Sequence, residues 1–362
     1  MCSDPNPPAP LAMTEFYAEH VHNHIHADPE QTLQKYRRRI TSELTKFGIA
    51  VEQLRDKTIL DIGSGWQAIV FQELGCRQIY HLDINPKHVD FLNAYLAEHG
   101  IRNITSEQAD ISRSLGSAHD IDLAFVAGVY HHLADREGFL AQLLPNMAKD
   151  SDILFRVYRA GTWSRWLVGM LRTASIGRLT PAQLLGAYRL LHPYGLDNQF
   201  VGDLIDDLLT PQWQAFRPQQ FIVDAERLQL QCQQCPAPAF DFDFSDRDEN
   251  FRVKWHIDDP GAINLATQPM ATGQAHVENT GTAPQITDLA DKLTELLASL
   301  SNYPNRDAAT ILVALYFLVR KHHGVDAYRG QIADASANPE LADWRIAQLQ
   351  ASLTYFRDWL SR

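Results

Sequence analysis

The chain has 362 residues, of which 45% are hydrophobic and 21% are charged, as expected for a globular protein of one large domain with an appendage, or of two domains. Its formal net charge of −12 disfavours a nucleic-acid partner, because an acidic surface repels phosphate.

Four cysteines are too few for a disulfide framework. The Pro-rich residues 1–12 lack the apolar segment of a secretion signal, and the longest apolar stretch, Ala308 to Val319, is too short to cross a bilayer. We therefore expect a cytoplasmic protein.

The first part of the chain alternates short apolar segments with amphipathic ones. A helix begins at Glu30, and apolar residues then recur at three- and four-residue steps until Gly48. The expected strands are Thr58–Ile62, Gln78–Asp83, Ile104–Ala109, Ile121–Ala127 and Ile153–Tyr158. The helices expected between them are Ala68–Leu74, Lys87–His99 and Arg136–Met147. Strands that alternate with helices predict a parallel sheet covered on both faces.

The pattern changes after the fifth strand. Helical stretches rich in Trp, Leu and Arg fill residues 160–217, and a helix at Pro218–Leu228 precedes a strand pair. The strand pair is expected at Gln229–Gln234 and Phe251–Ile257, the later helices at 306–322 and Pro339–Leu360. The predicted organisation is a flexible segment at 1–29, a catalytic domain at 30–258 with an insert at 160–217, a linker at 259–284 and a helical bundle at 285–362.

The carboxyl ends of the expected strands carry the candidate binding residues, because open α/β sheets bind ligands at that edge. Gly63, Ser64 and Gly65 follow the first strand, and two glycines allow a tight turn and close backbone approach to a ligand. With Ala68 they also satisfy the dinucleotide fingerprint. Asp83, at the end of the second strand, can accept hydrogen bonds from the ribose hydroxyls of a dinucleotide or of an adenosyl cofactor.

Three further features favour an adenosyl cofactor over a dinucleotide. Asp61 stands two residues before the first glycine, where a carboxylate can face an ammonium group, which a dinucleotide lacks. Asp110 ends the third strand and can accept a hydrogen bond from an adenine amino group. The fourth strand is followed by Gly128-Val129-Tyr130-His131-His132. All these residues come to the same edge of the sheet.

Together the stretches TILDIGSGWQA, IYHLDINP, SEQADI and DLAFVAGVYHHL resemble class I S-adenosylmethionine-dependent methyltransferases of the small-molecule type. The resemblance covers roughly residues 55–160 and implies a Rossmann-like, seven-stranded, mostly parallel sheet, with the helical insert and the C-terminal helical bundle as additions. It departs from the family at Gln67, where a small residue is usual. The residues that it implies for the cofactor S-adenosyl-L-methionine are Asp61, Gly63, Ser64, Gly65, Asp83, Asp110 and Ile111.

The catalytic candidates lie at the ends of the fourth and fifth strands. His131 and His132 are candidates for a general base or for a group that orients the acceptor; the alternative is that they pack beneath the cofactor or cap the next helix. Tyr130 belongs to the same segment. Arg156 ends the fifth strand and can bind an acidic acceptor, although plain solvation would also explain it.

Two weaker patterns remain open. His20, His22, His24 and His26 alternate near the N-terminus, so that in an extended segment several imidazoles would share one face. No cysteine or carboxylate cluster completes a metal site, and we expect a cover over the site and no bound metal. Cys232 and Cys235 have C-x-x-C spacing without a second pair, which favours two unliganded cysteines.

The sequence therefore predicts methyl transfer to an O, N or C atom of a small, biosynthetic type of acceptor. No Asn-Pro-Pro-Tyr-like segment follows the fourth strand, which disfavours the amino groups of nucleobases or glutamine. Three alternatives stay open: an RNA- or protein-modifying methyltransferase, a non-catalytic cofactor-binding module, and a nicotinamide-dependent dehydrogenase. A homodimer through the C-terminal helices is the expected assembly, with no membrane partner.

Overall fold

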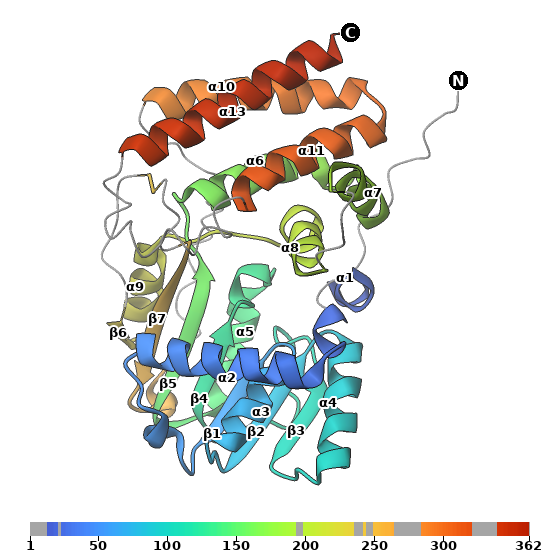
Figure 1. Ribbon diagram of the computed structural model, residues 1–362. Coiled ribbons are helices and arrows are strands. Elements are labelled where there is room, and N and C mark those ends of the chain that lie inside the picture. The colour runs from blue at the N-terminus through green and yellow to red at the C-terminus, as the bar shows by residue number, and fades with distance from the viewer. Residues whose placement is uncertain are drawn as a thin grey trace.

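A seven-stranded sheet forms the centre of the computed structural model, which describes residues 13–20, 23–192, 198–234, 242–243, 249–263, 284–320 and 339–361 (Figure 1). The strand order is β3-β2-β1-β4-β5-β7-β6. The strands are β1 (Thr58–Ile62), β2 (Gln78–Asp83), β3 (Ile104–Gln108), β4 (Ile121–Ala127), β5 (Met147–Tyr158), β6 (Gln231–Gln234) and β7 (Asn250–Ile257). The first five run parallel, and β7 is antiparallel to both β5 and β6. The predicted fold class is confirmed.

Helices cover both faces of the sheet, which explains why all five residues of β1 are buried. One face carries α2 (Pro29–Lys46), α3 (Trp66–Glu73) and α4 (Pro86–His99), and the other carries α5 (Arg136–Leu143) and α9 (Pro218–Arg227). Short 3₁₀ turns connect these elements: η1 (Asn23–His26), η2 (Val51–Leu54), η3 (Tyr130–His132), η4 (Leu144–Asn146), η5 (Pro260–Ala262) and η6 (Leu300–Asn302). The chain order reverses between β1 and β4, so a ligand crevice is expected at their carboxyl ends.

Most predicted boundaries agree with the structure to within two residues, and the two largest differences are neighbours in the chain. The helix expected over Arg136–Met147 ends at Leu143, because Pro145 lacks the N–H that would continue it, and η4 follows. Strand β5 then begins at Met147 and is longer than expected. Its Ser151–Tyr158 part pairs residue by residue with β7.

The insert and the C-terminal helices share one hydrophobic core. The insert contributes α6 (Trp163–Ser175), α7 (Pro181–Leu191) and α8 (Asn198–Leu209), and the C-terminal part contributes α10 (Pro284–Ser299), α11 (Asn305–Arg320) and α13 (Pro339–Leu360). Leu167, Leu204, Leu293 and Leu312 are each 0% exposed in this core. The predicted C-terminal helices are therefore the second half of a helical layer over the carboxyl edge of the sheet (Figure 1).

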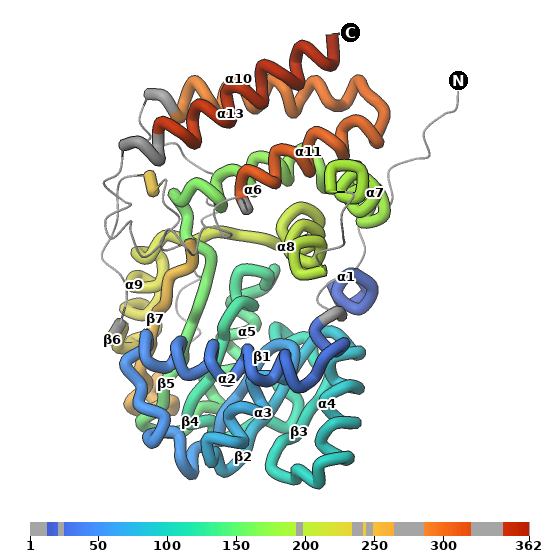
Figure 2. Tube along the Cα trace, viewed as in Figure 1, coloured from blue at the N-terminus to red at the C-terminus, as the bar shows by residue number. Residues whose placement is uncertain are grey.

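The N-terminal segment differs from the expected flexible tail. Residues 13–20 form α1 (Met13–His20), whose Phe16 is buried in the core of the helical layer. Figure 2 shows α1 beside α8, between that layer and the sheet. Burial of one aromatic side chain stabilises so short a helix, which would be marginal alone. The expected linker lies mostly outside the described residues, and none of the described helices is long and apolar enough to cross a membrane.

Candidate active site

A glycine turn joins β1 to α3 at the carboxyl edge of the sheet. Gly63 has φ +144° and Gly65 has φ +85°, a backbone region that side-chain-bearing residues rarely adopt. The N–H of Gly63 donates to the carbonyl of Leu82 at 3.2 Å, which ties the turn to β2. The first turn of α3 begins directly after Gly65, so its unpaired N–H groups lie beside the glycine turn.

Gln67, where the family usually has a small residue, contacts this turn. Its Nε2 lies 3.4 Å from the point where a Cβ on Gly63 would sit. Its Oε1 accepts from the Ser64 hydroxyl at 3.3 Å, and Ser64 in turn lies 3.2 Å from the hydroxyl of Tyr36 on α2. The Gln67 side chain therefore occupies part of the space beside Gly63 and fixes Ser64 from within the turn.

Asp61 is a buried carboxylate with no hydrogen-bond partner among the described residues. Its side chain is 0% exposed, neither oxygen makes a well-formed hydrogen bond, and the nearby backbone N–H of Ala68 only partly offsets the cost of burial. Burial raises the pKa of Asp61 to about 8, because the charged form is costly away from water. Side chains alternate along a strand, so Asp61 on β1 and Asp83 on β2 point to the same face of the sheet. An ammonium group would give Asp61 the partner that it lacks.

Asp83 is held by the chain around it. Its Oδ1 accepts from the N–H of Asn85 at 2.8 Å, and its Oδ2 accepts from Nδ1 of the buried His88 at 2.7 Å. Each carboxylate oxygen has two lone pairs, so both oxygens keep acceptor capacity for a diol. His88 was not among the predicted site residues, although its place five residues after Asp83 puts it on the first turn of α4.

His81 is a second residue that sequence reasoning missed. It lies on β2 beside Asp61, its Nε2 donates to the carbonyl of Gly63, and its Nδ1 accepts from the hydroxyl of Ser106 at 2.8 Å. Burial lowers the pKa of His81, which keeps the ring neutral and fits one donor and one acceptor nitrogen. His81 thus holds the glycine turn against β2 and β3. Its alternation with Asp83 along the strand is the signal that would have found it.

The two residues predicted for the adenine differ in exposure. The Asp110 side chain is 43% exposed, and its carboxylate accepts from the N–H of Ser112 at 3.1 Å and pairs with Arg113 at 3.3 Å. Ile111 is 5% exposed and packs in the core on the face of the sheet that α5 and α9 cover. Asp110 is thus accessible to a ligand at this edge, whereas the Ile111 side chain points into the core.

His131 and His132 lie on η3, directly after β4. The ring of His131 stacks on Tyr158 with 3.5 Å between centroids, and neither of its nitrogens has a partner among the described residues. The guanidinium carbon of Arg165 also lies 3.5 Å from the Tyr158 centroid, so the two groups occupy opposite faces of that ring. Burial, with the nearby positive charges of Arg165 and Arg156, holds the pKa of His131 well below its usual range.

Tyr130 and Arg156 lie apart from this stack. Tyr130 is 1% exposed and packs among Phe139, Phe155 and Phe221 in the core below the edge. We therefore leave Tyr130 out of the proposed chemistry. Arg156 lies on the face that bears Asp61, 3.9 Å from Glu43 of α2, and burial lowers its pKa to about 10.

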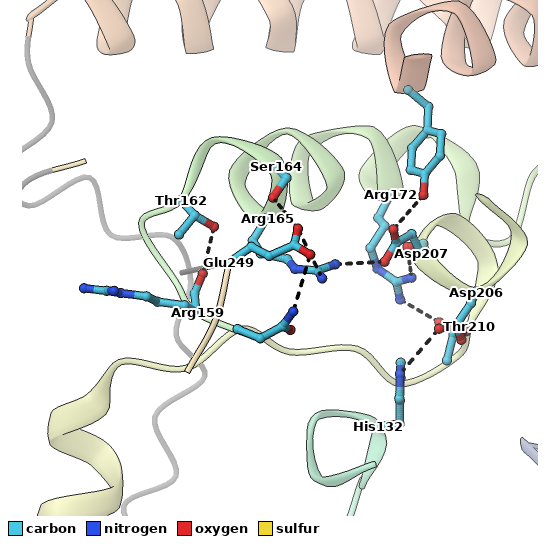
Figure 3. A network of polar contacts seen from close by, with 12 residues as sticks. His132, Arg159, Thr162, Ser164, Arg165, Arg172, Asp206, Asp207, Thr210 and Glu249 are labelled. Atoms are coloured by element: carbon cyan, nitrogen blue, oxygen red, sulfur yellow. Dashed lines mark hydrogen bonds and ion pairs between the residues drawn. The ribbon is translucent and has the colours of Figure 1, made fainter. Parts of the chain in front are cut away.

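A polar network on the helical layer faces His132 (Figure 3). Arg165 of α6 pairs with Asp207 at 3.1 Å, and the other oxygen of Asp207 accepts from the Tyr316 hydroxyl at 2.7 Å. Asp206 precedes Asp207 on α8 and lies 3.6 Å from Nε2 of His132. The network brings together residues far apart in the sequence, and none of them belonged to the predicted site.

The described residues give no support for a metal site at the alternating histidines or at the C-x-x-C pair. Among the described residues no group of three or more His, Cys, Asp or Glu side chains is arranged to hold a metal ion. The side chains of His22 and His24, and Cys235, lie outside those residues, while Cys232 lies on β6. The expected pair of unliganded cysteines and the expected cover formed by the alternating histidines therefore stay untested predictions.

Comparison with known proteins identifies one domain within the chain. Residues 60–150 match the family model described as "Methyltransferase domain". Residues 60–150 therefore form a methyltransferase domain, and the parallel sheet to which they belong agrees with the predicted class I fold. The cofactor of this domain is S-adenosylmethionine, and the buried, unpartnered carboxylate of Asp61 fits the ammonium group of that molecule.

Solved structures resemble the methyltransferase domain only distantly. A protein from Listeria monocytogenes is 18% identical over 33% of this chain and 54% of its own, with a TM-score of 0.29. A methyltransferase from Mesorhizobium loti is 21% identical over 29% and 48% of the two chains (TM-score 0.26), and one from Aquifex aeolicus is 11% identical over 68% and 99% (TM-score 0.37). The chain spans about half the length of the first two. No curated protein matches the chain.

Proposed function

We propose that the protein transfers a methyl group from S-adenosylmethionine to an O, N or C atom of a small molecule. The observation that carries the proposal is the buried Asp61 carboxylate, which has no hydrogen-bond partner beside the Gly63–Gly65 turn. The cationic amino acid end of a cofactor would favour the charged form of this carboxylate and give it a partner. Asp83 on the neighbouring strand keeps acceptor capacity for a ribose on the same face.

The roles of this chain's residues follow from their positions. Asp61 and the glycine turn would hold the methionine end of the cofactor, Asp83 the ribose and Asp110 the adenine amino group. When bound, S-adenosylmethionine supplies a methyl group on a positively charged sulfur, which is already a strong electrophile. The protein's work is then to align the acceptor, to exclude water and, for a protic acceptor, to take a proton. The residue nearest this task is His132, and His131 lies beside it.

Enclosure of the histidines supports a small acceptor. His131 is 2% exposed and His132 is 8% exposed, and both lie beneath residues of α8 and the segment that follows it. A nucleobase in a polymer or a side chain on a folded protein would need this cover to open. The net charge of −12 also disfavours RNA. A homodimer through the C-terminal helices stays a prediction.

Direct binding tests the cofactor assignment. Calorimetric titration of the full chain with S-adenosylmethionine should show one site, and Asp83→Ala should weaken affinity by roughly tenfold or more, because hydrogen bonds to a charged carboxylate are lost. Asp110→Ala, which removes a more exposed carboxylate, should have a smaller effect. Unchanged affinity in Asp83→Ala, or tight binding of a nicotinamide dinucleotide instead, would contradict the assignment.

A labelling experiment tests the acceptor class. The protein is incubated with S-adenosylmethionine labelled in its methyl group and with three separate fractions of a cell extract: small molecules, RNA and protein. We expect label in the small-molecule fraction. Label in RNA or protein alone would overturn the proposed acceptor, and tight cofactor binding without transfer to any fraction would indicate a non-catalytic binding module.

A further inference from the structure

We propose that Nε2 of His132 is the proton acceptor for an N–H or O–H nucleophile, and that Asp206 of the helical insert is the positioning residue for it. This inference rests on the proposed methyl transfer and narrows its acceptor to a protic nucleophile. The helical insert then contributes a residue to the reaction and does not only cover the active site. Contacts at three places support it: at Nδ1 of the histidine, and at Oδ1 and Oδ2 of the carboxylate.

The first contact defines the proton on the ring. Nδ1 of His132 lies 2.8 Å from the backbone carbonyl of Gln212. A carbonyl oxygen only accepts hydrogen bonds, so Nδ1 carries the proton. In the neutral ring, Nε2 then has a free lone pair. The segment after α8 thereby orients the imidazole with its basic nitrogen toward α8 (Figure 3).

The second and third contacts place the carboxylate. Oδ1 of Asp206 accepts from the hydroxyls of Thr210 at 2.6 Å and Tyr17 at 3.1 Å. Oδ2 lies 3.6 Å from Nε2 of His132, which is longer than a direct hydrogen bond. Two acceptors therefore border one position, which lies beside the line that joins them, because 3.6 Å leaves no room for an atom between them. A nucleophile that bears N–H or O–H satisfies the lone pair of Nε2 there, and Asp206 stabilises the imidazolium once the proton has moved.

The surrounding charges keep this ring available as a base. Burial is the largest effect and lowers the pKa of His132, and Arg172 acts in the same direction, whereas Asp206 and Asp207 raise it. The uncharged rings of Tyr17 and Tyr158 meet the imidazole edge to face, and His131 lies 4.3 Å away between centroids. The net effect is a neutral ring at neutral pH, which can accept a proton.

His131 is unsuited to the same task. It is confined against Tyr158, and Arg165 lies on the opposite face of that ring. A second positive charge in this buried stack would be unfavourable, because the guanidinium already repels it. The choice between the adjacent histidines thus follows from their neighbours: a carboxylate beside His132 and a guanidinium near His131.

The acceptor gives one proton to Nε2, and its freed electron pair forms the new bond to the methyl carbon. The carbon–sulfur bond breaks with its electrons on sulfur, so that the positive charge moves from sulfur to the imidazolium, which then releases the proton to solvent. An acceptor carbanion or thiolate would need no such base.

Nuclear magnetic resonance of the full chain labelled with ¹⁵N in its histidine rings tests the pair without any acceptor. The His132 signals are assigned by their loss in His132→Gln. We expect the Nδ1–H tautomer at neutral pH and a pKa below the ordinary value. In Asp206→Asn the pKa should fall further, since a carboxylate that favours the imidazolium is gone. Asp203→Asn, one turn earlier on α8, is the matched control and should leave the His132 pKa unchanged.

Each outcome decides the inference. The Nε2–H tautomer in the unmodified chain, or the same His132 pKa in Asp206→Asn as in the unmodified chain, would overturn it. If Asp206→Asn does not fold, Thr210→Val, which removes the hydroxyl that holds Oδ1, should shift the His132 pKa instead. None of these readouts needs cofactor binding, so their failure is distinguishable from failure of the proposed function.

A second arm tests the acceptor class. Products formed from small-molecule extract and ¹³C-methyl-labelled cofactor are examined by their methyl carbon shifts, which separate N- and O-methyl from S- and C-methyl groups. N- or O-methyl products are expected, and their rate of formation should fall as pH decreases through the His132 pKa. Exclusive S- or C-methylation would overturn the protic class.

Discussion

At the scale of single residues, the charged form of Asp61 is suited to bind the cofactor but lowers the stability of the folded chain. A pKa of about 8 in the folded chain lies above the ordinary value for aspartate. As pH rises past the ordinary value, the unfolded chain loses this proton while the folded chain keeps it. The stability of the folded chain therefore decreases as pH rises from the ordinary pKa of aspartate to about 8. The same carboxylate is suited to bind a cation.

Asp61→Asn tests this pH dependence. Without cofactor, the variant should gain melting temperature relative to the unmodified chain, and the gain should increase from about pH 5 to about pH 8. Thermal unfolding at several pH values measures it. Saturating S-adenosylmethionine should cancel or reverse the gain in melting temperature, because its ammonium group forms an ion pair with aspartate but not with asparagine. A gain that does not change with pH would mean that Asp61 is not a strained buried acid.

At the scale of elements, the turn between β1 and α3 depends on the space around Gly65. A Cβ at this position would lie 3.0 Å from Cδ2 and 3.3 Å from Cβ of Leu92 on α4. The same glycine needs φ +85°. Backbone conformation and close helix packing therefore both require glycine there, and the first of these is visible in the sequence while the second is not.

Gly65→Ala separates the two requirements when compared with Gly75→Ala. Gly75 has φ +86°, but its Cβ would lie 4.0 Å from the nearest atom, Cγ of Arg55. Both variants should lose about 1–2 kcal/mol from the positive φ, and Gly65→Ala should lose roughly 1–3 kcal/mol more from overpacking. Chemical denaturation measures both. Equal losses would show that α4 yields freely at Leu92.

The strands and most helices were predictable from the sequence because their signals are local. Asp28 caps α2, with its side chain accepting from the N–H of Gln31 at 3.0 Å, and Gly100 ends α4 with φ +64°. The partners of the candidate base were not predictable, because Tyr17 and Asp206 are 189 residues apart in the chain. A helix that consists of eight residues, such as α1, has no strong periodicity of its own, so its place depends on Phe16 finding the distant core.

At the scale of the whole molecule, the insert and the C-terminal helices should unfold as one unit. The hydroxyl of Tyr316 on α11 donates to Asp207 on α8 in a buried contact of 2.7 Å. Tyr316→Phe leaves that oxygen without this donor and should lower stability by about 1–3 kcal/mol. Tyr355→Phe on α13, where the side chain is 63% exposed, is the control and should change stability by about 0.5 kcal/mol or less.

Two probes distinguish a shared unit from separate ones. Circular dichroism reports helix content across the molecule, and tryptophan fluorescence reports Trp163 and Trp166 in the insert core among its signals. In Tyr316→Phe both probes should shift to lower denaturant together. A shift in one probe alone would mean that the C-terminal helices melt independently of the insert.

The shared core of the helical layer also has a consequence for synthesis on the ribosome. The sheet is complete once β7 ends at Ile257, but the apolar faces of α6 and α8 gain their full cover only when α11 and α13 have emerged. During that interval a growing chain exposes apolar helix surface, the condition under which nascent proteins aggregate or recruit chaperones. Slow translation of the last third of the chain should therefore lower the yield of folded protein more than slow translation of the sheet.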